Sequence, residues 1–119
     1  MNDLLQIAAQ NREKAFKIVD DLHLVELWQS IGAEVHLVGS LKMGLLMKHK
    51  DIDFHVYSAP LLLADSFAVV AKLAQNTAIK RIEYNNLIDT DEKCIEWHVC
   101  YLDEGNELWQ IDMIHILKG

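Results

Sequence analysis

Five residues of this chain combine a type and a position that could bind a metal ion and phosphate. Gly39 and Ser40 follow a short apolar run, Asp51 and Asp53 alternate in a later segment, and Asp112 lies between two apolar residues near the end of the sequence. Carboxylates are the hard oxygen ligands that Mg²⁺ prefers. A Gly-Ser turn that begins a helix suits an anion, because backbone N–H groups point out of a helix N-terminus. The residue types therefore indicate a divalent-cation site beside a phosphate site.

The spacing of the acidic residues sharpens this interpretation. Alternate side chains of a strand share a face, so Asp51 and Asp53 are expected roughly 7 Å apart at their Cα atoms, close enough to hold one divalent cation or a pair. Two-metal sites hold ions about 3.5–4 Å apart and orient the attacking and leaving oxygens of a displacement. Such a site needs a third carboxylate. Asp112 is the candidate, because an ionised side chain among apolar neighbours requires a cation or a hydrogen-bond partner.

Hydrophobic periodicity predicts the elements that must position these residues. Residues 3–31 have helical spacing and predict two helices or one bent helix, with a break near residues 20–23 and Gly32 at the C-terminal end. Proline suits the first turn of a helix, so Pro60 is expected to begin the next long one. The remaining expected elements are a buried strand at 34–38, a short helix at 41–47, an alternating strand at 51–57, a helix at 60–75, and strands at 79–88, 94–102 and 107–117, the last two joined by a turn at 103–106.

This order predicts a single α/β (α+β) domain over residues 1–119. The expected sheet is mixed and mostly antiparallel. Ile52, Phe54 and Val56 would face helices packed on one side, while the carboxylates stay open on the other side. The length suits one compact core, because domains of this size are common.

Composition excludes several classes of protein. The 119 residues are 51% apolar and 24% charged, and the net charge of −7 argues against broad nucleic-acid binding. No segment has the roughly 20 apolar residues of a membrane span, and the N-terminus lacks a basic secretory region, so a cytoplasmic protein is expected. Cys94 and Cys100 would lie about 20 Å apart in one strand and cannot pair there. Lys42, Lys48 and Lys50 would lie beside the candidate site as a local basic patch, and Lys48 and Lys50 would either attract a triphosphate or simply solvate a loop.

The motifs together resemble those of the DNA polymerase beta-like nucleotidyltransferase superfamily. That pattern is a helix-initiating Gly-Ser, an acidic-x-acidic pair, and a later acidic residue between apolar ones. The resemblance covers most of the chain, roughly from the helix before Val35 to Ile116. The matching segments are Val38-Gly39-Ser40, Asp51-Ile52-Asp53-Phe54 and Ile111-Asp112-Met113.

The resemblance implies a magnesium-dependent nucleotidyltransferase. It would move a nucleoside monophosphate from a nucleoside triphosphate, expected to be ATP, to an unidentified hydroxyl-type acceptor, with pyrophosphate leaving. Asp51 and Asp53 would ligate Mg²⁺ (or Mn²⁺), and Asp112 would complete the metal site or act as the base for the acceptor hydroxyl. The implied phosphate-binding residues are Gly39, Ser40 and Lys42.

Two features depart from the family pattern. Many relatives carry a basic residue four places after the Gly, where this chain has Met43; the adjacent Lys42 points about 100° away on a helix. Related enzymes also add a helical region that holds the acceptor. This chain ends shortly after Leu117, so it is expected to be either a truncated piece or a minimal member.

Two other functions stay open. One is a non-catalytic module of the same fold that binds nucleotide or a toxin partner, as an antitoxin would. The other is an acidic α/β domain that recruits a basic protein partner.

Several side chains near the carboxylates have more than one interpretation. His55 shares their face and could touch substrate or simply be a sheet residue. Either Glu96 and His98 or Trp97 would face Asp112, depending on the hairpin register. Trp97, Trp109 and Tyr101 are interpreted as cross-strand packing residues. Zinc at Cys94, His98 and Cys100 is excluded, because three residues along one extended strand cannot all reach one ion.

Overall fold

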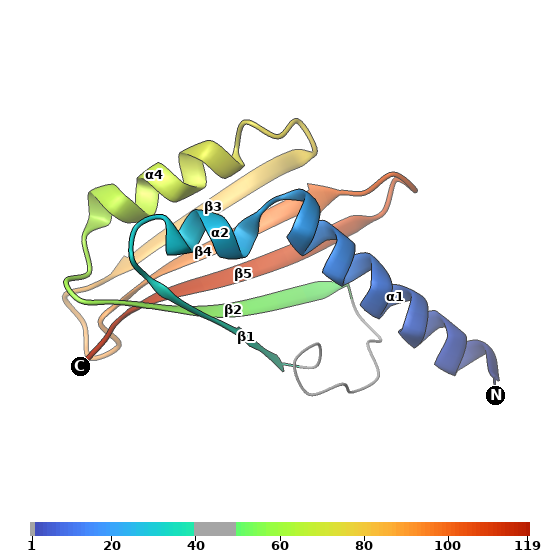
Figure 1. Cartoon of the computed structure of the whole chain (residues 1–119), viewed down its shortest axis with the longest axis horizontal. Helices are drawn as coiled ribbons and strands as arrows, with labels where there is room; N and C mark the ends of the chain where they lie inside the picture. The colour runs from blue at the N-terminus through green and yellow to red at the C-terminus, as the bar shows by residue number, and fades with distance from the viewer. Residues whose placement is uncertain (1, 40–49) are drawn as a thin grey trace.

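The computed structural model describes residues 2–39 and 50–119. Its strands form one five-stranded sheet in the order β1-β2-β5-β4-β3 (Figure 1). Strands β2 and β5 are parallel, and the other neighbouring pairs are antiparallel. The predicted mixed, mostly antiparallel sheet is confirmed. The elements are α1 (Asn2–Asp21), α2 (Leu24–Gln29), β1 (Glu34–Val38), β2 (Asp51–Ser58), α4 (Leu63–Leu73), β3 (Ile79–Leu87), β4 (Cys94–Leu102) and β5 (Leu108–Leu117).

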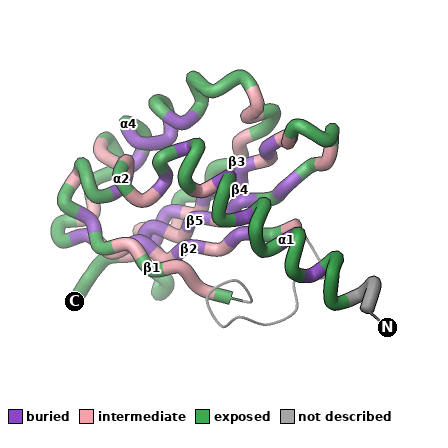
Figure 2. The backbone as a smooth tube through the Cα atoms, turned by 45° about the vertical axis from the view of Figure 1, so that its right-hand side comes forward, coloured by how far each residue is buried: buried purple, intermediate pink, exposed green. Residues whose placement is uncertain are grey.

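The described helices lie on one face of the sheet, as Figure 1 shows. The alternation in β2 determines which face they cover, since Ile52, Phe54 and Val56 are at most 1% exposed. Buried residues are concentrated where strands and helices meet, and exposed residues on the outer helix surfaces (Figure 2). Trp28 of α2 and Trp97 of β4 are among the largest buried side chains. The opposite face of the sheet, called the open face below, carries Asp51, Asp53 and Asp112.

The predicted break between the first two helices falls at His23. This residue adopts a left-handed conformation with φ 53°, and its N–H donates to the carbonyl of Asp20 at 3.1 Å. Helix α2 ends at Gln29 with Ser30 as C-cap, and Gly32 follows with φ +81°. Gly32 thus lies one residue later than the C′ position predicted for it.

The prediction that Pro60 begins a helix is wrong. Helix α4 starts at Leu63, and its N-cap Leu62 is extended, with φ −106° and ψ 125°. Pro60 lies in a bend after β2 and follows a cis peptide bond from Ala59. The proline therefore belongs to the connection between strand and helix. The helix expected at 41–47 lies outside the described residues.

Asp103 organises the turn between β4 and β5. Its Oδ1 accepts hydrogen bonds from the backbone N–H groups of Gly105 and Glu107, each at 2.9 Å. Its Oδ2 accepts one from the indole N–H of Trp109, also at 2.9 Å. The turn fixes the hairpin register that the sequence left open, and this register places His98 opposite Asp112.

Within residues 2–39 and 50–119, no helix is both long enough and apolar enough to cross a membrane. Cys94 and Cys100 are both free thiols.

Candidate active site

Parallel pairing of β2 with β5 brings two of the predicted acidic residues together. Asp53 and Asp112 are direct partners in this pairing, although they are far apart in the sequence. Asp51 lies two residues before Asp53 and therefore shares its face of the sheet. The three carboxylates thus lie on the open face at neighbouring strand positions. Had the register been shifted by one residue, Asp112 would point into the core.

The proximity of these acidic groups changes the pKa of Asp53. Burial is the largest of the effects that raise the pKa of Asp53 to about 6, followed by the neighbouring carboxylates of Asp112 and then Asp51. Like charges placed together disfavour ionisation, and a divalent cation would reverse this effect. The donor set fits Mg²⁺ or Mn²⁺, because all three side chains offer hard oxygen ligands.

Two side chains on the open face hold Asp112 in place. His98 Nδ1 donates to Asp112 Oδ1 at 2.6 Å, and Gln110 Nε2 donates to the same oxygen at 3.0 Å. The hydrogen bond to Asp112 raises the pKa of His98. Sequence reasoning left His98 open and missed Gln110. The signal for Gln110 was its position two residues before Asp112, which places both on one face.

Gly39 directly contacts the acidic site. It has φ +77°, and a Cβ atom added to it would lie 2.9 Å from Asp53 Oδ2. A contact this short would force the carboxylate to move. The absence of a side chain at Gly39 therefore leaves space for the Asp53 carboxylate. This role is separate from the phosphate contact predicted for Gly39.

A Gly39→Ala variant is expected to lose both stability and metal affinity. A left-handed conformation costs a non-glycine residue about 1–2 kcal/mol, and the added methyl group would displace Asp53. We expect Mg²⁺ affinity to fall about tenfold by calorimetry, a loss typical of disturbed metal-ligand geometry. Gly32→Ala is the matched control, since Gly32 has φ +81° and no atom within 4 Å of an added Cβ. Equal Mg²⁺ affinity in the two variants would contradict the role given to Gly39.

Of the predicted basic patch, the structure describes Lys50. Its Nζ lies 3.1 Å from Glu107 Oε2. Lys50 is thus paired with a carboxylate of the β4–β5 turn. Ser40, Lys42, Met43 and Lys48 lie outside the described residues.

Two hollows flank the carboxylates on the open face. One, of about 530 Å³, is lined in part by His36, His55 and Tyr57, and the His36 and Tyr57 rings meet edge-on with centroids 5.5 Å apart. His55 therefore belongs to this hollow. The other, of about 270 Å³, is lined by Asp112's partners His98 and Gln110 together with Arg81, Glu83 and Cys100.

The residues on the other face are structural. Trp97 and Trp109 are at most 2% exposed, and Trp97 donates to Ser66 Oγ at 2.8 Å. Trp97 thus points away from Asp112, which settles the alternative raised by the hairpin register.

Comparison with solved structures identifies the fold. The sequence matches no protein-family model and no curated protein. In contrast, a mutant of the Cid1 poly(U) polymerase bound to MgATP aligns with a TM-score of 0.67 at 17% identity, over 89% of this chain and 32% of that one. Such polymerases belong to the DNA polymerase beta-like nucleotidyltransferase superfamily. This chain has the nucleotidyltransferase fold.

Other neighbours of this fold give the same result. A cytoplasmic RNA terminal U-transferase aligns with a TM-score of 0.58 at 17% identity, over 97% of this chain and 36% of that one. The non-canonical poly(A) polymerase complex GLD-2–GLD-3 aligns with a TM-score of 0.53 at 13% identity, over 97% and 40%. The chain with the nucleotidyltransferase fold thus spans about a third of the length of these neighbours.

Proposed function

We propose that this chain carries the metal and nucleotide site of a nucleotidyltransferase. The reaction would transfer a nucleoside monophosphate from a nucleoside triphosphate, with ATP as the expected donor, to a hydroxyl-type acceptor, and pyrophosphate would leave. The single observation that carries the proposal is the pairing of Asp53 with Asp112 on the same face as Asp51. The fold supports it, and neighbouring structures are described as bound to MgATP and MgGTP.

In this proposal each acidic residue has a separate task. Asp51 and Asp53 hold Mg²⁺ (or Mn²⁺), and Asp112 shares a metal ion or accepts the proton of the acceptor hydroxyl. His98 and Gln110 donate to Asp112 and so fix its orientation. Bound Mg²⁺ would neutralise charge on the transferred phosphoryl group and lower the pKa of the attacking hydroxyl.

Substrates would bind on both sides of these carboxylates. Gly39 and Ser40, with Lys42, are proposed to contact the triphosphate. The hollow of about 270 Å³ next to His98 and Gln110 is the proposed approach for the acceptor hydroxyl, because it adjoins Asp112. Further acceptor contacts are expected from a region outside this chain, since the chain spans about a third of its structural neighbours. We propose the cytoplasm as its location.

The decisive experiment combines calorimetry with a pyrophosphate-release assay. Binding of ATP would be measured with and without Mg²⁺. Pyrophosphate release would then be followed with a panel of acceptors, namely short RNA, an aminoglycoside, a hydroxyl-bearing protein and small alcohols. We expect Mg²⁺-dependent ATP binding and release with at least one acceptor.

Other outcomes would favour the competing functions. ATP binding without release from any acceptor would favour a non-catalytic nucleotide-binding or antitoxin-like module. Failure to bind ATP in the presence of Mg²⁺ or Mn²⁺ would contradict the nucleotide site itself and leave an acidic protein-interaction domain.

A further inference from the structure

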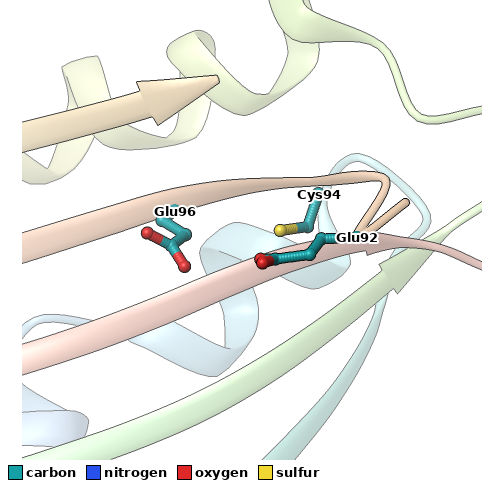
Figure 3. Close-up of side chains that lie close together, drawn as sticks. All are labelled: Glu92, Cys94 and Glu96. Carbon is teal, nitrogen blue, oxygen red and sulfur yellow. The ribbon is translucent and has the colours of Figure 1, made fainter. Parts of the chain in front are cut away.

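A second group of metal-ligand side chains lies at the start of β4, apart from the three aspartates. Glu92 belongs to the turn before the strand, and Cys94 and Glu96 belong to the strand itself. The thiol sulfur and one carboxylate oxygen from each glutamate all lie within 4.8 Å of one another. Figure 3 shows the three side chains gathered beside β4.

Local backbone geometry explains why Glu92 joins the two strand residues. Cys94 and Glu96 alternate along β4 and therefore share a face. Lys93 has φ 47°, a left-handed conformation that turns the chain just before the strand. Long glutamate side chains can then converge on the shorter cysteine from both sides. Cys94, His98 and Cys100 cannot converge in this way, because they lie along one extended strand with no such turn between them.

The thiol in this group is buried and unpartnered. Cys94 is 3% exposed, and no hydrogen bond to its sulfur occurs among the described residues. In Figure 3 the sulfur points into the space between the two carboxylates. The two neighbouring carboxylates carry like charges that a cation placed between them and the sulfur would balance.

The surroundings leave this negative charge largely uncompensated. Glu96 receives a hydrogen bond from Asn85 Nδ2 at 3.4 Å, and its Oε1 lies 3.6 Å from His98 Nε2. No ion pair to Glu92 is found in the part of the chain that the structure describes. Glu96 is therefore held by two neighbours, whereas the exposed Glu92 is not tied to a basic side chain of the described residues.

We propose that Glu92, Cys94 and Glu96 bind one divalent cation of the zinc class. Zinc bonds of about 2.3 Å to sulfur and about 2.0–2.2 Å to oxygen place tetrahedral ligand atoms roughly 3.5 Å apart, so small side-chain rotations from the present geometry suffice. A thiolate ligand selects zinc over magnesium, which prefers oxygen alone. Three protein ligands leave the fourth position to water.

The test is a titration with Cd²⁺ and Zn²⁺ in the presence of excess Mg²⁺. Cadmium bound to a thiolate has an ultraviolet absorption band that a site of carboxylates alone cannot produce, and calorimetry would give the Zn²⁺ stoichiometry. We expect one Cd²⁺ or Zn²⁺ per chain. The Cys94→Ser variant should lose the band, and Glu92→Gln should bind Zn²⁺ at least about tenfold more weakly.

Cys100→Ser is the matched control, because Cys100 lies on the same strand and face but outside the cluster. We expect it to bind like the wild type, and Asp53→Asn to keep the cadmium band. Loss of the band in Cys100→Ser, or its retention in Cys94→Ser, would overturn the proposal. Should Cys94→Ser fail to fold, unchanged Zn²⁺ affinity in Glu92→Gln would overturn it, since Glu92 is exposed and its substitution leaves the core intact.

Discussion

An Asp53→Asn variant is expected to lose at least about 10³-fold in nucleotidyl transfer while gaining stability relative to the wild type. Asparagine has the shape of aspartate but no charge, so it could not replace a carboxylate proposed to hold Mg²⁺ against a developing phosphoryl charge. The measurement is pyrophosphate release at saturating Mg²⁺, with whichever acceptor of the proposed panel supports release by the wild type.

Stability distinguishes this functional loss from a folding defect. Burial and two acidic neighbours raise the pKa of Asp53 to about 6, so its ionised form destabilises the folded chain at neutral pH. Removing that charge in buffer with a metal chelator should raise the free energy of unfolding by about 1 kcal/mol, after allowance for screening by solvent. Residues that serve function at a cost in stability show this pattern.

Asp89→Asn is the matched control, because Asp89 is an exposed residue of the turn before β4. It makes the same chemical change in a turn that contains none of Asp51, Asp53 and Asp112. We expect wild-type activity and stability from it. If Asp53→Asn kept transfer activity within about tenfold of this control, the metal site would have to be assigned elsewhere.

The pairing of Asp51 with Asp53 on one face of the strand was predictable, because it depends only on the order of residues within one short segment. Alternation along residues 51–57 separates carboxylates from Ile52, Phe54 and Val56, and burial of the apolar set determines where the helices pack. The position of Asp112 beside Asp53 depends on pairing between distant strands. Sequence periodicity alone does not specify such pairing; Asp112 was a candidate because of its apolar neighbours and because it matched the family pattern.

Other features depended on interactions that a local pattern does not encode. The hairpin register follows from hydrogen bonds of Asp103, which a turn-forming composition predicts only in general. The start of α4 was predicted too early, because a proline suits both a first helical turn and the bend that precedes it. Close approach of Gly39 to Asp53 is equally tertiary, since two separate strands must first pair.

One buried polar residue was predictable but overlooked. His115 follows Ile111 and Met113 at intervals of two, so the alternation of β5 places it on the core face, and it is 0% exposed. Ser58 Oγ lies 2.7 Å from its Nε2 and Ser66 Oγ 3.0 Å from its Nδ1. A neutral imidazole, which has one N–H donor and one acceptor nitrogen, satisfies both contacts.

This environment predicts that the protein loses stability in mild acid. Burial lowers the pKa of His115 to about 4, and the negative charge of Asp65 opposes this only in part. An unfolded histidine has a pKa of about 6.5, so between pH 6.5 and pH 4 the unfolded chain binds more protons than the folded one. Stability from His115 is therefore complete above pH 6.5 and falls by about 3 kcal/mol as the pH approaches 4.

Urea unfolding at pH 7.5 and at pH 4.5 would measure this loss. His115→Gln cannot titrate but keeps a donor and an acceptor, so its stability should fall less between the two pH values than that of the wild type. His98 acts in the opposite direction, because its raised pKa gives stability that is present in acid and is lost as the pH rises through that pKa. The contribution of His98 to the pH dependence of stability is the same in the variant and the wild type. It therefore cancels when the two are compared, as do the contributions of the other shared groups.

His36→Gln serves as the control for removing a histidine, since its side chain is about half exposed. We expect it to depart less from the wild-type pH dependence than His115→Gln does, because burial lowers the pKa of His115. Parallel curves for wild type and His115→Gln would mean that His115 accepts a proton in the folded state as readily as in the unfolded one. That outcome would require water or a rearranged Ser58 and Ser66 to solvate the imidazolium, which contradicts the packing of Trp28 against the His115 ring at 4.9 Å.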